Sequence, residues 1–320
     1  MPADTQNSYT SLHATSSLPG HDAQGQAKPN QNAVAVDTNL SNLAITLLGV
    51  FDGHGPMGAG VAKAVAGLLP PAVAREAALL KADRYAAAMD RAFPRCNRAI
   101  TRVRGLDTQL SGCTSCVALL TPQGQLVVAN LGDSRCLLGK VEPCGQGVTA
   151  WEFTNDHTPA SPAEAARVQA CGGCVAKYSV HGQAVGPLRV WCKDRDAPGL
   201  CITRSFGDAL AHSIGVTEEP EVVTHSLEKS DRYLLIVTNS ICEYMENQEV
   251  MEYVHAQASQ GLAPEAVGKS LCQEAQRRWR QHEQGLAAEC TVVVVYLHQQ
   301  SAEVCDSRAT VSCMPSLRRK

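Results

Sequence analysis

The segment LLGVFDGHGPMG, residues 47 to 58, places groups that can do chemistry directly after an apolar run. The five residues before Asp52 predict a buried strand, and the glycines after it predict a sharp turn. This turn would leave Asp52 at the strand end and His54 on an exposed loop. A carboxylate there can hold Mg²⁺ or Mn²⁺, and the carbonyl of Gly53 can add an oxygen because no side chain blocks its approach. A surface turn in which Asp52 only satisfies the backbone stays open as an alternative.

The bulk composition excludes several classes of protein. With 320 residues and 44% hydrophobic content, the chain can bury a large core in one big domain or two small ones. A net charge of −3 gives no general attraction to nucleic acid or to an anionic membrane. No run of about 18 apolar residues exists, and the amino terminus lacks the apolar core of a secretory signal. We therefore expect a cytoplasmic or nuclear protein without nucleic-acid or membrane partners.

The chain has 14 cysteines, and their positions do not suggest a disulfide framework. Several lie in predicted apolar strands, which is typical of buried, reduced cysteines in a cytosolic protein: Cys113, Cys116, Cys136, Cys201 and Cys290. Cys171 and Cys174 form a single CGGC without the second pair that a zinc site needs. We interpret that segment as a helix end turning on two glycines.

The amino-terminal third contains a polar segment, a predicted hairpin and helices. Residues 1–27 are polar and aperiodic, which predicts a disordered tail. Residues 33–36 and 43–51 predict two strands joined by a polar turn. A helix is expected from residue 58 until Pro70 and Pro71 stop it. More helix is expected over residues 83–103.

From residue 112 onward the pattern changes to short strands followed by helices. Residues 161–173 predict an amphipathic helix with Ser161 as its cap and Glu164 three residues later. The apolar segment CTVVVVYL, which begins at Cys290, predicts a final strand in the interior of a sheet. Strand runs and helix runs are grouped rather than strictly alternating, which favours an α+β fold over a doubly wound parallel fold.

Four segments in order carry a resemblance to a known family: DGHG at 52–55 followed by an alanine-rich helix, SGCTSCVALL at 111–120, ANLGDSR at 129–135 and GLCITRSFGD at 199–208. This set resembles the protein phosphatase 2C (PPM-type) family of metal-dependent serine/threonine phosphatases. KPNQNAVAV at 28–36 and RRW at 277–279 are most similar to the plant and algal members. The resemblance predicts a domain over residues 28–298 and a carboxy-terminal tail over residues 299–320.

The resemblance implies two antiparallel sheets packed as a sandwich, helices flanking both sides, and a metal cleft at one edge. In that family the aspartate of DGHG, here Asp52, bridges two Mg²⁺ or Mn²⁺ ions, and a water held between them attacks phosphorus. The histidine, here His54, is proposed to protonate the leaving oxygen; a solvated loop histidine is the alternative. Gly53, Asp133 and Glu243 also match metal-binding positions of the family.

Three positions depart from the family pattern. Asn32, Asn239 and Ala288 occupy positions where the family has aspartates. Each lost carboxylate removes roughly 4 kcal/mol of attraction to a nearby unit charge, before desolvation is subtracted. Glu289 is a possible substitute ligand, but the next residue on a strand points to the opposite face, so we expect it to need a bulge or register shift.

Three further charged residues have predicted roles. Arg204 matches a buried arginine of the family, and Asp208 follows it in the usual place; we expect an internal ion pair between them that organises the fold. The family's phosphate-binding arginine has no clear counterpart, and Lys28 is the nearest cation, able to hold phosphate as a point charge.

The sequence therefore predicts a phosphatase-family protein with a degraded metal centre and low or no activity. The alternative is a pseudophosphatase that binds a phosphoprotein or protein kinase without turnover. A third possibility is an active enzyme using Asn239 and Glu289 as substitute ligands. We expect a monomer, and with the degraded centre at most one weak Mg²⁺ or Mn²⁺ site.

Overall fold

A computed structural model describes residues 8–143 and 145–300, and two antiparallel sheets form its centre. The first has the order β14-β7-β6-β3-β2. Its strands are β2 (Ala33–Leu40), β3 (Ile45–Phe51), β6 (Ser115–Leu120), β7 (Gln125–Leu131) and β14 (Glu221–Ser226). The second has the order β1-β16-β15-β8-β9. Its strands are β1 (Ser8–Leu18), β8 (Arg135–Val141), β9 (Val148–Glu152), β15 (Asp231–Val237) and β16 (Cys290–Gln300).

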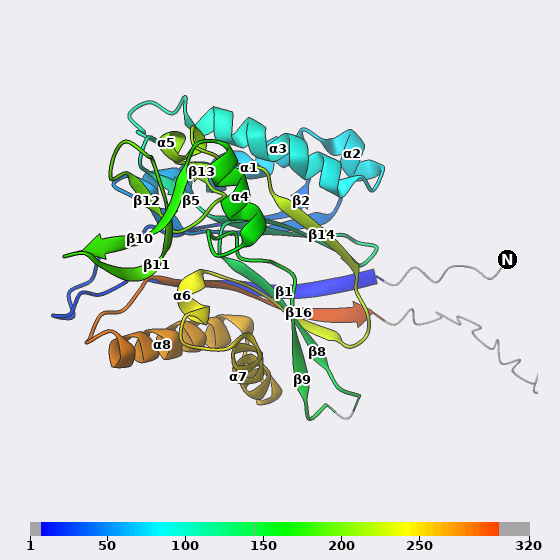
Figure 1. Ribbon diagram of the computed structural model, residues 1–320. Coiled ribbons are helices and arrows are strands. Elements are labelled where there is room, and N and C mark those ends of the chain that lie inside the picture. Colours follow the sequence, from blue (N-terminus) through cyan, green and yellow to red (C-terminus); the bar gives the residue numbers. More distant parts are fainter. Residues whose placement is uncertain (1–7, 144, 301–320) are drawn as a thin grey trace, which may run out of the picture.

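Helices cover the outer face of each sheet (Figure 1). The first sheet is covered by α1 (Gly58–Ala74) and α3 (Tyr85–Ile100), which the short α2 (Ala77–Lys81) connects, and the second by α7 (Asn247–Ser259) and α8 (Pro264–His282). This is the predicted α+β sandwich with helices on both sides. None of the helices in the described ranges is long and apolar enough to cross a membrane.

The apolar strand runs are explained by burial on both faces. Along β3, Leu47 and Phe51 pack into the layer beneath α1 and α3, whereas Leu48 and Val50 pack between the two sheets. Successive side chains of a strand point to opposite faces, so a strand between two apolar layers needs a continuous apolar run. The same holds for β16, which lies between β1 and β15 as the interior strand that its sequence predicts.

Two small sheets and three further helices complete the described part of the fold. β4 (Gly53–His54), β5 (Gly112–Cys113) and β13 (Phe206–Gly207) form one small sheet. β10 (Cys174–Val180), β11 (Gln183–Trp191) and β12 (Pro198–Leu200) form another. The remaining helices are α4 (Pro162–Ala170), α5 (Ala209–His212) and α6 (Asn239–Cys242). As predicted, the CGGC segment ends a helix: α4 stops at Cys171, and Gly172 takes a φ of 90°.

The prediction of a disordered tail over residues 1–27 is wrong for the part that the structure describes. Residues 8–18 form β1, which pairs along its whole length with β16. Its sequence is polar because β1 is an edge strand: Leu12 and Thr15 are exposed, and its hydrogen bonds come from the backbone. Residues 1–7 and 301–320, most of the predicted carboxy-terminal tail, lie outside the described residues.

The prediction that Pro70 and Pro71 stop the first helix is also wrong, because α1 continues through both to Ala74. Each proline removes a helical N–H donor, leaving the carbonyls of Ala66 and Gly67 without their usual partners. Gly67 is exposed and Ala66 is half-buried, so water can serve these carbonyls. Surface placement explains why the helix tolerates the pair.

Candidate active site

Asp52 lies between β3 and β4 and borders two cavities. The first, about 340 Å³, is also lined by His54, Thr114, Asp133 and Asp208. The second, about 250 Å³, is lined by Gly53, Lys28, Ser240, Ala288 and Glu289 among others. Asp52 therefore separates two half-sites at one end of the sandwich.

Backbone contacts fix Asp52 and Gly53 in place. The Asp52 N–H donates to Thr114 Oγ1 at 3.1 Å, and the Thr114 N–H donates back to the Asp52 carbonyl at 2.9 Å. A Cβ on Gly53 would lie 2.5 Å from the carbonyl oxygens of both Gln31 and Gly58. Only glycine fits this close approach of three backbone segments, which explains why glycine follows the aspartate.

The buried acidic side chains of this site have raised pKa values. Burial raises the pKa of Asp52 to about 7, and the neighbouring Asp133 and Glu289 contribute to this rise. Burial also raises the pKa of Asp133 to about 6, with Asp156 adding to the shift. Buried carboxylates with raised pKa values are typical of a site that receives a cation.

His54 is paired with Asp208 rather than solvated on a loop. Its Nε2 lies 2.7 Å from Asp208 Oδ2, and its side chain is 28% exposed. Burial lowers the pKa of His54, but Asp208, through charge and hydrogen bonding, raises it above its ordinary value, with Asp52 and Asp133 adding to the rise. The Ser205 hydroxyl donates to the same Asp208 oxygen at 2.6 Å. Glycine at position 112 leaves room for the Asp208 carboxylate, because a Cβ there would lie 2.2 Å from Asp208 Oδ2.

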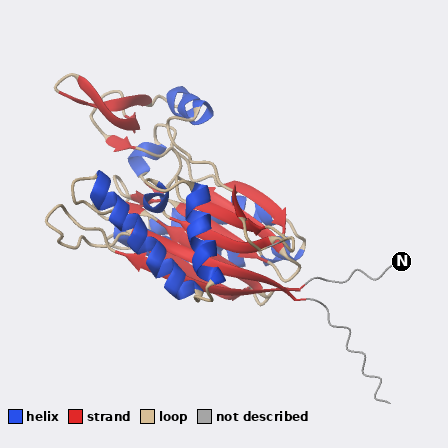
Figure 2. Cartoon of the chain, turned by 90° about the horizontal axis from the view of Figure 1, so that it is seen from below, coloured by secondary structure: helices blue, strands red, loops and turns tan. Residues whose placement is uncertain are grey.

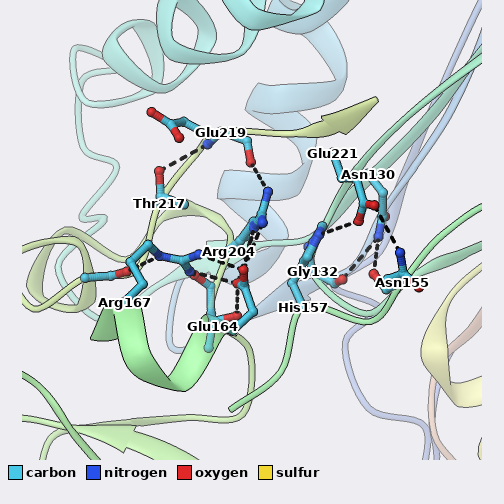
Figure 3. Close-up of polar contacts among 12 residues, drawn as sticks. Asn130, Gly132, Asn155, His157, Glu164, Arg167, Arg204, Thr217, Glu219 and Glu221 are labelled. Carbon is cyan, nitrogen blue, oxygen red and sulfur yellow. Dashed lines mark hydrogen bonds and ion pairs between the residues drawn. The ribbon is translucent and has the colours of Figure 1, made fainter. Parts of the chain in front are cut away.

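The predicted ion pair between Arg204 and Asp208 is therefore wrong. Arg204 binds Glu164 instead, with Nη2 2.8 Å from Oε1, and also donates to the Glu219 carbonyl (Figure 3). Arg167 binds the same carboxylate with both terminal nitrogens, and the Thr203 hydroxyl also donates to it. Burial raises the pKa of Glu164, but these hydrogen bonds hold it well below its usual range. The sequence pattern had suggested only a helix-cap role for Glu164, and the Ser161 side chain makes no cap hydrogen bond.

His157 is a second residue that sequence reasoning missed. Its Nδ1 accepts from the Gly132 N–H at 3.2 Å, and its Nε2 lies 3.2 Å from Glu221 (Figure 3). Burial lowers the pKa of His157, and Arg204 lowers it further. Gly132 immediately precedes Asp133, so His157 holds the turn that presents this acid. No local motif marks His157, because its partners are distant in sequence.

Glu289 reaches the site without a bulge, contrary to expectation. It precedes β16, where strand alternation does not yet apply, so Glu289 and Ala288 line the same second cavity. The Gln31 N–H donates to Glu289 Oε2 at 2.7 Å. The carboxylate is thereby fixed beside Asp52.

Other predicted site residues are placed differently. Asn32 Nδ2 donates to Thr291 Oγ1 at 2.9 Å, and its Oδ1 is buried without a hydrogen-bond partner in the described part of the chain. Asn239 begins α6, and its neighbour Ser240 lines the second cavity in its place. Glu243 is exposed just after α6 and borders neither cavity. Lys28 lines only the second cavity.

Comparison with known proteins agrees with this fold. The sequence model described as Protein phosphatase 2C matches residues 17–283. The chain belongs to the protein phosphatase 2C family. Two rice relatives named probable protein phosphatase 2C 64 and 48 are 35% and 32% identical, over 90% and 79% of this chain and 67% and 75% of theirs.

Solved structures of the protein phosphatase 2C fold overlay on the chain. A serine-threonine phosphatase 2C from Toxoplasma gondii has a TM-score of 0.77 at 20% identity, covering 91% of this chain and 96% of its own. A C. elegans sex determining protein has a TM-score of 0.67 at 21% identity, covering 89% of this chain and 64% of its own.

Members of the protein phosphatase 2C family generally depend on Mg²⁺ or Mn²⁺, so the donors present can be tested for fit. Asp52, the Gly53 carbonyl and Glu289 offer hard oxygen donors around the second cavity and fit one ion that keeps several waters. Position 288 adds no donor to this cavity, because its side chain is a methyl group. The described residues contain no group of three or more His, Cys, Asp or Glu side chains arranged to hold a metal.

Proposed function

We propose that this protein phosphatase 2C family member has a degraded metal centre and hydrolyses phosphoserine or phosphothreonine in proteins slowly or not at all. The second cavity carries this proposal. Ala288 removes a ligand there, and Lys28 brings a positive charge to the wall where a cation would be held. The amide of Asn32 is engaged with Thr291 instead of the cavity.

The first cavity supports retained recognition of a phosphate ester. When bound, the metal ions of this family supply charge neutralisation and an activated water. His54 is available to donate a proton to the leaving oxygen from Nδ1, because Asp208 engages Nε2. Asp208 both orients the ring and favours its protonated form.

A pseudophosphatase that binds a phosphoprotein or a protein kinase as a monomer is the second candidate. The observation that favours it is the contrast between the two cavities: His54 and Asp208 remain paired in the first, while the donors of the second are incomplete. An active enzyme that uses Asn239 and Glu289 is less well supported. Glu289 lies on the second cavity, but Asn239 does not line it.

Restoring the acids tests the proposal. The triple variant Asn32→Asp, Asn239→Asp, Ala288→Asp should raise Mn²⁺-dependent turnover of a phosphothreonine peptide by at least about a hundredfold over wild type. Single reversions should do much less, because ligands of one centre act as a unit. Asn42→Asp, an amide-to-acid change at an exposed turn, is the matched control.

Robust wild-type turnover that Asp52→Asn abolishes would contradict the proposal and make this an ordinary enzyme of its family. A triple variant as slow as wild type would show that the missing carboxylates are not the cause of low activity. Both outcomes are read from initial rates with purified protein.

A further inference from the structure

The small sheet β10-β11-β12 projects from the body of the fold beside α4 (Figure 2). It contributes a large part of the wall of the first cavity, from Arg189, Pro198, Gly199 and Leu200. Gly199 and Leu200 begin the segment GLCITRSFGD that carries the family resemblance, whereas Arg189 and Pro198 lie outside all four segments. The sequence therefore assigns no function to Arg189.

Arg189, on β11, is the one lysine or arginine that lines the first cavity in the described ranges. It is half-buried, and its Nη1 donates to the Gly199 carbonyl at 2.7 Å. Among the described residues it forms no ion pair, and its remaining guanidinium N–H groups have no hydrogen-bond partner. A half-buried arginine that keeps free donors beside a cavity is ready to bind an anion.

The other charged groups on the cavity make Arg189 electrostatically distinct. Asp52, Asp133 and Asp208 line the same cavity. Cys201 lines the same cavity, and its thiol is affected by both charges: burial raises its pKa, Arg189 lowers it, and Asp133 raises it. A phosphate dianion approaching these carboxylates needs a counter-charge, and Arg189 supplies one on the same cavity.

The β10-β11 hairpin holds Arg189 in a defined position. Trp191 Nε1 donates to the Ala176 carbonyl at 3.0 Å, and the Trp191 ring stacks on Tyr178 with centroids 6.1 Å apart. The same ring packs on Gly199, where a Cβ would lie 2.8 Å from the indole, and Gly199 has a φ of 73°. These contacts fix the Gly199 carbonyl that anchors the Arg189 guanidinium.

We propose that Arg189 binds the phosphoryl group of a phosphoserine or phosphothreonine segment entering the first cavity. The inference rests on the proposed function and adds a substrate-contacting residue to it. Lys28, the cation expected from sequence, borders the other cavity and is not placed for this role. A guanidinium suits the task because it can donate two parallel hydrogen bonds to phosphate oxygens.

Binding of a fluorescent phosphothreonine peptide and its unphosphorylated counterpart, measured by anisotropy with Mn²⁺ and again with EDTA, tests this role. Arg189→Ala should weaken binding of the phosphorylated peptide about tenfold to a hundredfold and leave the unphosphorylated peptide unchanged. The affinity of Arg189→Lys for the phosphorylated peptide should fall between those of wild type and Arg189→Ala. Lysine keeps the positive charge but cannot donate the two parallel hydrogen bonds of a guanidinium. Where residual turnover is measurable, KM should rise more than kcat falls.

Arg195→Ala is the matched control, because Arg195 lies between β11 and β12, is 56% exposed and does not line the cavity. Thermal unfolding of each variant verifies that the hairpin remains folded. Equal phosphopeptide affinity in wild type and Arg189→Ala would overturn the proposal and leave the proposed function standing. A wild type that binds the phosphorylated peptide no better than the unphosphorylated one would also overturn the role of Arg189, whereas robust wild-type turnover would overturn the proposed function.

Discussion

His54 and Asp208 show how one buried residue sets the chemistry of another. Asp208 is 2% exposed and takes a φ of 44°, a left-handed conformation that is uncommon outside glycine. The small sheet β4-β5-β13 and Ser205 hold its carboxylate against the imidazole. The sequence matched Asp208 to a familiar motif but could not assign its partner, because His54 lies 154 positions away.

Replacing Asp208 by Asn should lower the pKa of His54, because burial would no longer be opposed by the adjacent charge. The folded-state pKa of His54 is raised, so its contribution to stability is fully present below the unfolded pKa and lost as pH rises through the folded pKa. Asp208→Asn should therefore cost about 1–3 kcal/mol of unfolding free energy near pH 6 and less near pH 9.

Urea unfolding at the two pH values and NMR titration of the imidazole measure these effects. Asp194→Asn, at a side chain that is 74% exposed, is the control. An unchanged His54 titration in Asp208→Asn would refute the pairing.

Asp52 should also make stability fall as pH rises, but here the ionised side chain destabilises the folded state. Its pKa is about 7 in the folded protein, above the ordinary value of 3.8, so the folded state holds a proton that the unfolded state releases. Without metal, the Asp52 contribution should make stability fall as pH rises from about 4 to about 7. Asp52→Asn should therefore raise the unfolding midpoint relative to wild type near pH 8, and the gain should disappear near pH 4.

This comparison is made in EDTA, with Asp194→Asn again as the control. A gain of equal size at both pH values would mean that Asp52 does not carry the raised pKa, and that the site holds no excess negative charge.

At the scale of elements, β1 connects the edge of the sandwich to the site. The Ser17 hydroxyl lies 2.7 Å from Thr291 Oγ1, which also accepts from Asn32, and Gln276 on α8 donates to the Pro19 carbonyl at 2.7 Å. Residues 8–18 therefore cover β16 and support the segment that carries Asn32. A disordered tail would do neither.

Deleting residues 1–18 should lower the unfolding free energy by more than about 3 kcal/mol, because it exposes the backbone edge of β16 and part of the apolar layer beneath α8. Deletion of residues 1–7 leaves β1 intact and is the matched control. Equal urea midpoints for the two deletions would show that β1 adds nothing to the stability of the sandwich.

Elements with apolar periodicity could be predicted, and elements held by their neighbours could not. β3 and β16 are continuous apolar runs because two layers bury them, and α3 has one apolar face. β1 lacks such a pattern because backbone pairing with β16 forms it. α1 passes through two prolines because its unpaired carbonyls lie near solvent, which local sequence does not reveal.

At the scale of the whole molecule, the sandwich and its helical layers place the candidate site at one end. The sequence predicted Asp52, Asp133 and His54 as neighbours, and all three line one cavity. It misjudged Glu289, because strand alternation was applied to residues 288 and 289, which precede β16. It missed Glu164, His157 and Arg189, whose roles arise from contacts between distant segments.

The stoichiometry of Mn²⁺ binding tests the degraded centre most directly. Calorimetric titration of the wild-type protein should show no more than one Mn²⁺ per chain, bound weakly, because Asp52, Gly53 and Glu289 offer too few charged oxygens for two ions. Asp52→Asn should abolish the signal. Two sites of micromolar affinity in the wild-type protein would contradict the account.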